Sequence, residues 1–202
     1  MTSTGEITAG NIVGAGRRFI MRGGYSGFSY ADIAEATGLR KASIHHHFPA
    51  KSDLAIAVVK QSTDLFNTDM SALDASGASS LDQIKAYIGY WERCISDSSA
   101  PFCVAGMLGA ELPSLPDDVA AEVRAHFENL SAWLERALEA GAKAKLIKLT
   151  DSARAESATL VALIYGAMLT ARAFGNAALF KEVTDSAVAK LVRSRKASTS
   201  GE

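Results

Sequence analysis

The side chains best suited to chemistry lie close together between Ser29 and Lys51. We expect a short helix to begin at Arg40 or Lys41, with cationic and hydrogen-bonding side chains on its outer side. These outward-facing residues are Lys41, Ser43, His45 and His46. Such side chains can donate hydrogen bonds to base edges and to phosphates. Their grouping on one short helix therefore indicates contact with the major groove of DNA.

The residues around this helix supply the elements that would hold it in place. Ser29 and Asp32 form a Ser-x-x-Asp capping box, which begins a preceding helix by binding its backbone N–H groups. Gly38 can adopt the left-handed conformation that ends that helix. Ile44 and Phe48 are four residues apart, so both point from the second helix toward the core. Two short helices joined by a glycine turn form a helix-turn-helix.

Three consecutive histidines, His45 to His47, raise the alternative of a metal site. Consecutive side chains on a helix point about 100° apart. Three of them in a row therefore cannot bind one ion without distortion. We predict no metal ion and no cofactor, and we expect His47 to be partly buried beside the turn.

The charge of the chain is divided unevenly. Residues 1–60 contain seven basic and four acidic side chains, although the 202 residues together have a net charge of −1. A basic amino-terminal part on an acidic remainder is typical of a protein that touches phosphate at one end only.

The composition is that of a folded soluble protein, with 48% hydrophobic residues. The longest apolar run, residues 158–169, is too short to span a bilayer. The amino terminus has neither a basic start nor an apolar signal segment. We therefore expect a cytoplasmic protein without membrane contact, in which Cys94 and Cys103 are thiols.

Apolar residues recur at helical spacing almost throughout, so we predict an all-α fold. A first helix over about residues 8–22 completes a three-helix amino-terminal head with the helix-turn-helix, and a helical ligand-binding and dimerisation body follows. The further helices are expected from residue 52, over 81–96, 102–112, 117–141, about 150–175 and about 179–192, with a linker at 74–80. The predicted domains are a DNA-binding domain over 1–50, the body over 51–196 and a disordered tail over 197–202.

The helix expected around residues 160–173 is apolar on nearly all sides and contains many small residues. Helices of this kind are buried in a core or at an obligate interface. We favour an interface, because two DNA-reading heads related by a two-fold axis bind DNA more tightly and recognise a longer DNA sequence than one head does.

The pattern IAEATG-x-x-K-x-S-x-x-HHF-x-x-K at residues 33–51 resembles the head of the TetR family of bacterial repressors. The resemblance extends over about residues 8–66. It implies a homodimer that binds a palindromic double-stranded DNA operator and a small-molecule effector that releases it. Carried over by position, the predicted DNA-binding residues are Ser29, Tyr30, Arg40, Lys41, Ala42, Ser43, His45, His46 and Lys51. The family usually has tyrosine at the position of His45 and a small cap at that of Arg40, so no operator sequence is implied.

A second pattern, Cys-x-x-Gly-x-Leu-x-x-Glu in PFCVAGMLGAEL, resembles a TetR subgroup in which some members respond to reactive electrophiles or small unsaturated acids. Cys103 is expected near the amino end of a helix, where backbone N–H groups favour a thiolate. The alternative is a small apolar core residue, which is where most free cysteines lie. Cys94 is expected in the core.

Aromatic residues and methionines gather on the body helices, and a subset is predicted to line a ligand cavity. The predicted ligand-binding residues are Trp91, Phe102, Cys103, Met107, Phe127, Tyr165, Met168 and Arg172. Arg172 on an otherwise apolar helix needs an anion, either Glu111 or the carboxylate of a ligand.

The leading hypothesis is a ligand-responsive DNA-binding transcriptional regulator, in the simplest case a repressor. One alternative is a dimeric DNA-binding protein without ligand control, and another is a small-molecule enzyme in the helical body. Residues 67–202 contain no recognisable Ser/His/Asp, metal-spaced or phosphate-loop motif and a single histidine, His126. We therefore predict no catalytic residue.

Overall fold

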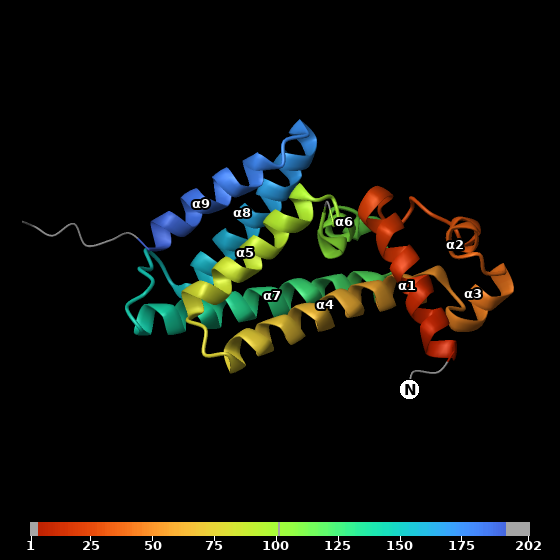
Figure 1. Ribbon diagram of the computed structural model, residues 1–202, viewed down its shortest axis with the longest axis horizontal. Helices are drawn as coiled ribbons and strands as arrows, with labels where there is room; N and C mark the ends of the chain where they lie inside the picture. Colours follow the sequence, from red (N-terminus) through yellow and green to blue (C-terminus); the bar gives the residue numbers. More distant parts are fainter. Residues whose placement is uncertain (1–3, 101, 193–202) are drawn as a thin grey trace, which may run out of the picture. The chain divides into compact units, whose positions relative to one another are not determined.

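The computed structural model describes residues 4–100 and 102–192, and every regular element within these residues is helical (Figure 1). The predicted all-α fold is confirmed. The elements follow the chain as α1 (Thr4–Gly23), α2 (Tyr30–Thr37), α3 (Lys41–His47), α4 (Lys51–Ala75), α5 (Ser80–Ser96), α6 (Val104–Ala110), the 3₁₀ turn η1 (Leu112–Ser114), α7 (Asp117–Lys143), α8 (Ala153–Phe174) and α9 (Ala178–Leu191).

The chain forms two compact units, and the boundaries between them fall inside α4, directly after α5 and inside α7. The first unit comprises residues 1–72 and 97–130, and the second comprises 73–96 and 131–202. The predicted division at residues 50 and 196 stays a prediction, and the predicted disordered tail lies outside the described residues.

The amino-terminal head of the first unit consists of α1, α2 and α3, with α2 packed against both of the others. Each helix contributes a fully buried isoleucine to the core, namely Ile20 from α1, Ile33 from α2 and Ile44 from α3. Phe28 follows α1 and stacks on Phe19, with 6.1 Å between the ring centroids. Burying each such side chain contributes about 2 kcal/mol, which is how so small a head holds its short helices.

The remainder of the first unit contains α6, η1 and the first part of α7. The single helix predicted over 102–112 is wrong in extent, because α6 begins only after Cys103 and ends before Glu111. Cys103 has an extended backbone and lies at the N-cap of α6. The chain then tightens into η1, which contains Pro113. Proline has no N–H group to continue an α-helix, and this explains the earlier end.

The second unit contains α5, the end of α7, α8 and α9, and α9 packs against both α8 and α5. The helix predicted from about residue 150 begins slightly later, with Ser152 as its N-cap, whose side chain accepts from the backbone N–H of Ala155. The backbone N–H and the hydroxyl of Thr150 both donate to the Glu156 carboxylate. These bonds lower the pKa of Glu156.

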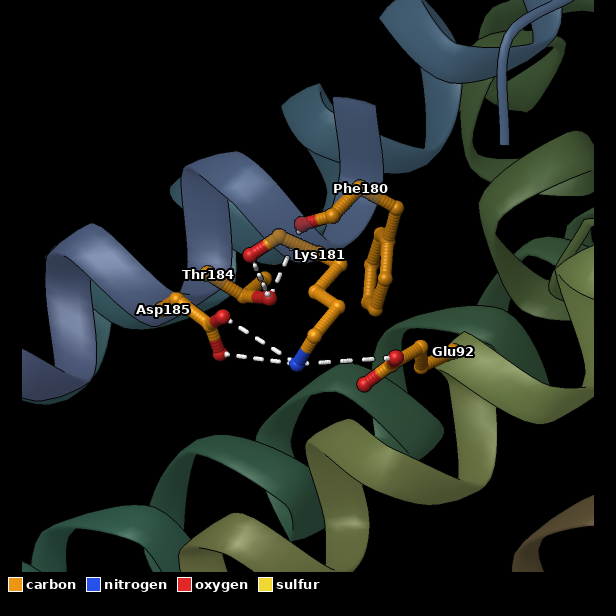
Figure 2. Close-up of polar contacts among 5 residues, drawn as sticks. All are labelled: Glu92, Phe180, Lys181, Thr184 and Asp185. Atoms are coloured by element: carbon orange, nitrogen blue, oxygen red, sulfur yellow. Dashed lines mark hydrogen bonds and ion pairs between the residues drawn. The ribbon is translucent and has the colours of Figure 1, made fainter. Parts of the chain in front are cut away.

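An ion-pair cluster joins α9 to α5 in this unit (Figure 2). The ammonium of Lys181 lies 3.1 Å from the Asp185 carboxylate on its own helix and 3.6 Å from Glu92 on α5. The hydrogen bond to Asp185 is the main reason that the pKa of Lys181 is raised. On the same helix, the fully buried hydroxyl of Thr184 donates to the carbonyl of Phe180. The exposed ion pairs contribute little free energy of unfolding, because water screens them.

Among the described residues, α8 is the one helix long and apolar enough to cross a membrane by length and composition. Core and interface helices of soluble proteins pass the same test, so this is weak support for a membrane span. Only 33% of its most apolar stretch is buried within the chain. Leu169 is 59% exposed and Phe174 is 75% exposed. The apolar surface of α8 is therefore incompletely covered by the chain itself.

Candidate nucleic-acid interface

The start of α2 is fixed by the predicted capping box. The hydroxyl of Ser29 accepts a hydrogen bond from the backbone N–H of Ala31, and the backbone N–H of Ser29 donates to the Asp32 carboxylate at 2.6 Å. The bonds from Ser29 lower the pKa of Asp32. At the other end, Gly38 takes a left-handed conformation with φ 69°. Both local signals from the sequence are confirmed, and they set where the turn between α2 and α3 begins.

The outer face of α3 is polar and cationic. Ile44 points inward and is fully buried. Ser43 is half-buried beside it. The exposed residues of this face are Arg40 at the N-cap, Lys41, Ala42, His45 and His46. The helix thus presents donors and a cation to solvent on a single face, and their contact with DNA stays a prediction.

Tyr30 connects the two helices of the motif. Its hydroxyl lies 2.7 Å from the carbonyl oxygens of both Phe48 and Ala50, to which it donates. Its ring meets His45 edge-on, with 4.7 Å between the centroids. Burial, followed by the negative charge of Asp53, raises the pKa of Tyr30 to about 12. A phosphate contact for Tyr30 stays a prediction, and in the structure its hydroxyl donates to the carbonyls that follow α3.

Lys51, at the first position of α4, is also engaged within the head. Its ammonium donates to the backbone carbonyl of Phe28. The same ammonium lies 4.3 Å from the centroid of the Phe28 ring and 4.8 Å from the centroid of the Tyr25 ring. Burial lowers the pKa of Lys51. A phosphate contact for Lys51 remains a prediction, while the structure shows its ammonium against Tyr25 and Phe28, in the segment between α1 and α2.

One residue was not predicted to belong to this region. The carboxylate of Glu111, next to the end of α6, accepts a hydrogen bond of 2.8 Å from the backbone N–H of Tyr25. The two residues are 86 positions apart. The motif that ends in Glu111 was visible in the sequence, but a side-chain bond to a distant backbone group leaves no spacing signal.

The predicted ligand-binding residues fall into both compact units. In the first unit, Phe102 and Cys103 are buried, and Met107 on α6 is half-buried. The ring of Phe127 approaches α6 so closely that a Cβ atom on Gly109 would lie 3.2 Å from it. These four residues therefore form the surroundings of one short helix.

In the second unit, Trp91 and Met168 are buried, Tyr165 is half-buried and Arg172 is exposed. The indole N–H of Trp91 is buried without a hydrogen-bond partner. A buried donor of this kind costs free energy until an acceptor reaches it. An acceptor group on a ligand would meet that need.

In the part of the chain that the structure describes, no group of three or more His, Cys, Asp or Glu side chains is arranged to hold a metal ion. The rings of His46 and His47 meet edge-on at 5.5 Å. Cys94 and Cys103 are both buried thiols.

Two family models match the chain. The model for bacterial regulatory proteins of the tetR family matches residues 12–58, which contain most of α1, all of α2 and α3 and the start of α4. The model for a tetracyclin repressor-like C-terminal domain matches residues 80–187.

Known proteins agree with these matches. A TetR-family transcriptional regulator from Agrobacterium tumefaciens has 44% sequence identity and a TM-score of 0.91, over 94% of this chain and 100% of that one. A TetR regulator from Legionella pneumophila has 26% identity and a TM-score of 0.82, over 95% and 98% of the two chains. The transcriptional regulator RutR of Escherichia coli K12 is 30% identical over 121 residues, which are 58% of this chain and 56% of RutR. The match thus spans little more than half the length of that curated relative. The chain belongs to the tetR family of bacterial regulatory proteins.

Proposed function

We propose that the chain is a transcriptional regulator of the cytoplasm that binds a palindromic DNA operator as a homodimer and is released by a small molecule. The observation that carries the proposal is the exposed face of α3, with Lys41, His45 and His46 pointing to solvent. A capped α2, the turn at Gly38 and the hydroxyl of Tyr30 hold that face in place. This is how a recognition helix is presented to a major groove.

The homodimer is supported by the uncovered apolar surface of α8. Leu169 and Phe174 are largely exposed, and most of the apolar stretch of the helix is not buried within the chain. A second copy of the same chain would bury this surface around a two-fold axis. Two heads related in this way would read half-sites about one helical turn of DNA apart, roughly 34 Å, or a multiple of that distance.

The release by a small molecule is supported by the buried indole N–H of Trp91, which lacks an acceptor. The subgroup pattern that starts at Cys103 suggests a reactive electrophile or a small unsaturated acid as the effector. The backbone N–H groups at the start of α6 follow Cys103 directly. Reactive thiols are often found beside donor groups of this kind, which is why Cys103 is the proposed point of reaction.

The experiment is a fluorescence-anisotropy titration with DNA from beside the gene of this protein, at several salt concentrations. Lys41→Ala should weaken binding and reduce the slope of log affinity against log salt by about one. Lys85→Ala is the matched control, because Lys85 is an exposed lysine on α5, in the other compact unit. The control should bind like the parent. Binding that is insensitive both to salt and to Lys41→Ala would refute the proposed function.

A further inference from the structure

The short helix α6 is attached to the DNA-reading head through one carboxylate. Glu111 follows the last residue of α6, and its side chain accepts the backbone N–H of Tyr25 at 2.8 Å. Tyr25 lies just beyond the end of α1, and α1 and α6 pack against each other. The bond therefore connects the end of α6 to the turn between α1 and α2.

The backbone at this turn is shaped to admit the carboxylate. Gly24 is buried and has φ +71°, a conformation that residues with a side chain rarely adopt. A Cβ atom at Gly24 would lie 1.7 Å from a carboxylate oxygen of Glu111. Glycine is thus needed here for two reasons, its backbone conformation and the close approach of Glu111.

The same carboxylate acts on a half-buried cation of the head, the ammonium of Lys51. The ammonium of Lys51 is half-buried against Phe28 and Tyr25, and burial disfavours its charged form. The negative charge of Glu111 opposes that effect and favours the ammonium. Lys51 is the first residue of α4. Glu111 therefore acts on two supports of the recognition helix, the end of α1 and the start of α4.

We propose that Glu111 is a positioning residue that holds the DNA-reading head in its binding geometry through the Tyr25 amide and the Lys51 ammonium. This inference rests on the proposed DNA-binding function. The seven residues of α6 separate Cys103 from Glu111.

Two substitutions separate the charge from the hydrogen bond. Glu111→Ala removes both, whereas Glu111→Gln keeps an oxygen acceptor for Tyr25 and removes only the charge. Amide hydrogen exchange is measured by NMR on the full-length protein without DNA. We expect exchange at Tyr25 to be about tenfold faster in Glu111→Ala and to stay closer to the parent in Glu111→Gln. Operator affinity should fall about tenfold in Glu111→Ala and less in Glu111→Gln.

A pair of glycine substitutions tests the contact independently. Gly24→Ala introduces strain at positive φ together with a collision with Glu111. Gly38→Ala introduces the same strain at φ +69°, but a Cβ atom there has open space. We expect Gly24→Ala to lower the melting temperature more than Gly38→Ala. In the Glu111→Ala background the collision with the carboxylate is gone, so the difference between the effects of the two substitutions should shrink.

The readouts distinguish this inference from the proposed function. If the parent binds no DNA, the proposed function fails, and the positioning role, which rests on it, is overturned as well. Unchanged exchange at Tyr25 in Glu111→Ala would overturn the link itself. Faster exchange with parental operator affinity would show that the link exists but does not position the head, and that outcome also overturns the proposal.

Discussion

The hydroxyl of Tyr30 donates to the carbonyl of Phe48 at 2.7 Å, so the first residue of α2 binds the residue that ends α3. The same hydroxyl lies 2.7 Å from the carbonyl of Ala50. Burial raises the pKa of Tyr30 to about 12, far above physiological pH, and the hydroxyl therefore keeps the proton that it donates. The side chain of Tyr30 thus links the start of α2 to the segment that follows α3.

Tyr30→Phe should lower the free energy of unfolding by about 1 kcal/mol, since it removes this hydrogen bond and keeps the ring against His45. Operator affinity should fall with it, because the end of α3 is less firmly held. Urea unfolding and anisotropy titrations on the same preparations measure both. A loss of affinity with unchanged stability would mean that the hydroxyl contacts DNA directly, contrary to this expectation.

His126 gives the first unit a dependence on pH. It lies on α7, is 7% exposed, and its Nδ1 atom is 2.8 Å from the hydroxyl oxygen of Thr63 on α4. Burial lowers its pKa to about 4. The unfolded chain has the ordinary value near 6.5 and so binds more protons between these two values.

The contribution of His126 to the free energy of unfolding is therefore complete above about pH 6.5. As the pH falls toward 4, this contribution is lost, which lowers the free energy of unfolding by roughly 3 kcal/mol. Carboxylates also titrate in this range, so the informative quantity is the difference between the parent and His126→Gln. The variant should show a shallower fall in unfolding free energy from pH 7 to pH 4. Parallel curves would contradict a buried neutral histidine.

The homodimer is tested at the exposed surface of α8. Leu169→Arg places a charge where Leu169 is 59% exposed in the single chain, and it should convert the dimer to a monomer because an unpaired charge would be buried in the interface. Leu65→Arg is the matched control, since Leu65 on α4 is 50% exposed. Sedimentation velocity at micromolar concentration should show a monomer for the first variant and a dimer for the second. If both variants sediment as dimers, Leu169 does not lie in the dimer interface.

Local signals in the sequence predicted the helix-turn-helix closely. Ser29, Asp32 and Gly38 act on backbone groups within a few residues, so residue type and spacing were sufficient to locate them. The start of α8 was placed one or two residues early, because Thr150, Asp151 and Ser152 can all act as caps and only the fold selects among them.

The contacts between distant segments could not be predicted in this way. The bond from Tyr25 to Glu111 depends on α6 packing against α1, and neither residue type requires the other. The contact of the Lys51 ammonium with the carbonyl of Phe28 could not be predicted either, because a lysine at the start of a helix is usually exposed. Sequence patterns specify elements and their faces, whereas such pairs appear only when the elements are assembled.

The role of Cys103 is decided by its reactivity. Its side chain is 3% exposed, so an electrophile reaches the thiol only when the surrounding structure opens. We expect N-ethylmaleimide or an acrylate-type acid to release the parent protein from DNA slowly, over minutes to hours rather than seconds.

Cys103→Ser should abolish the covalent release and leave binding in the absence of reagent close to that of the parent. Cys94→Ser is the matched control, because Cys94 is also a buried thiol but lies on α5, in the other compact unit. The control should still be released. Mass spectrometry after each reaction identifies the modified thiol, and anisotropy follows the loss of DNA. Release of the Cys103→Ser variant at the parental rate would make Cys103 a core residue without a part in sensing.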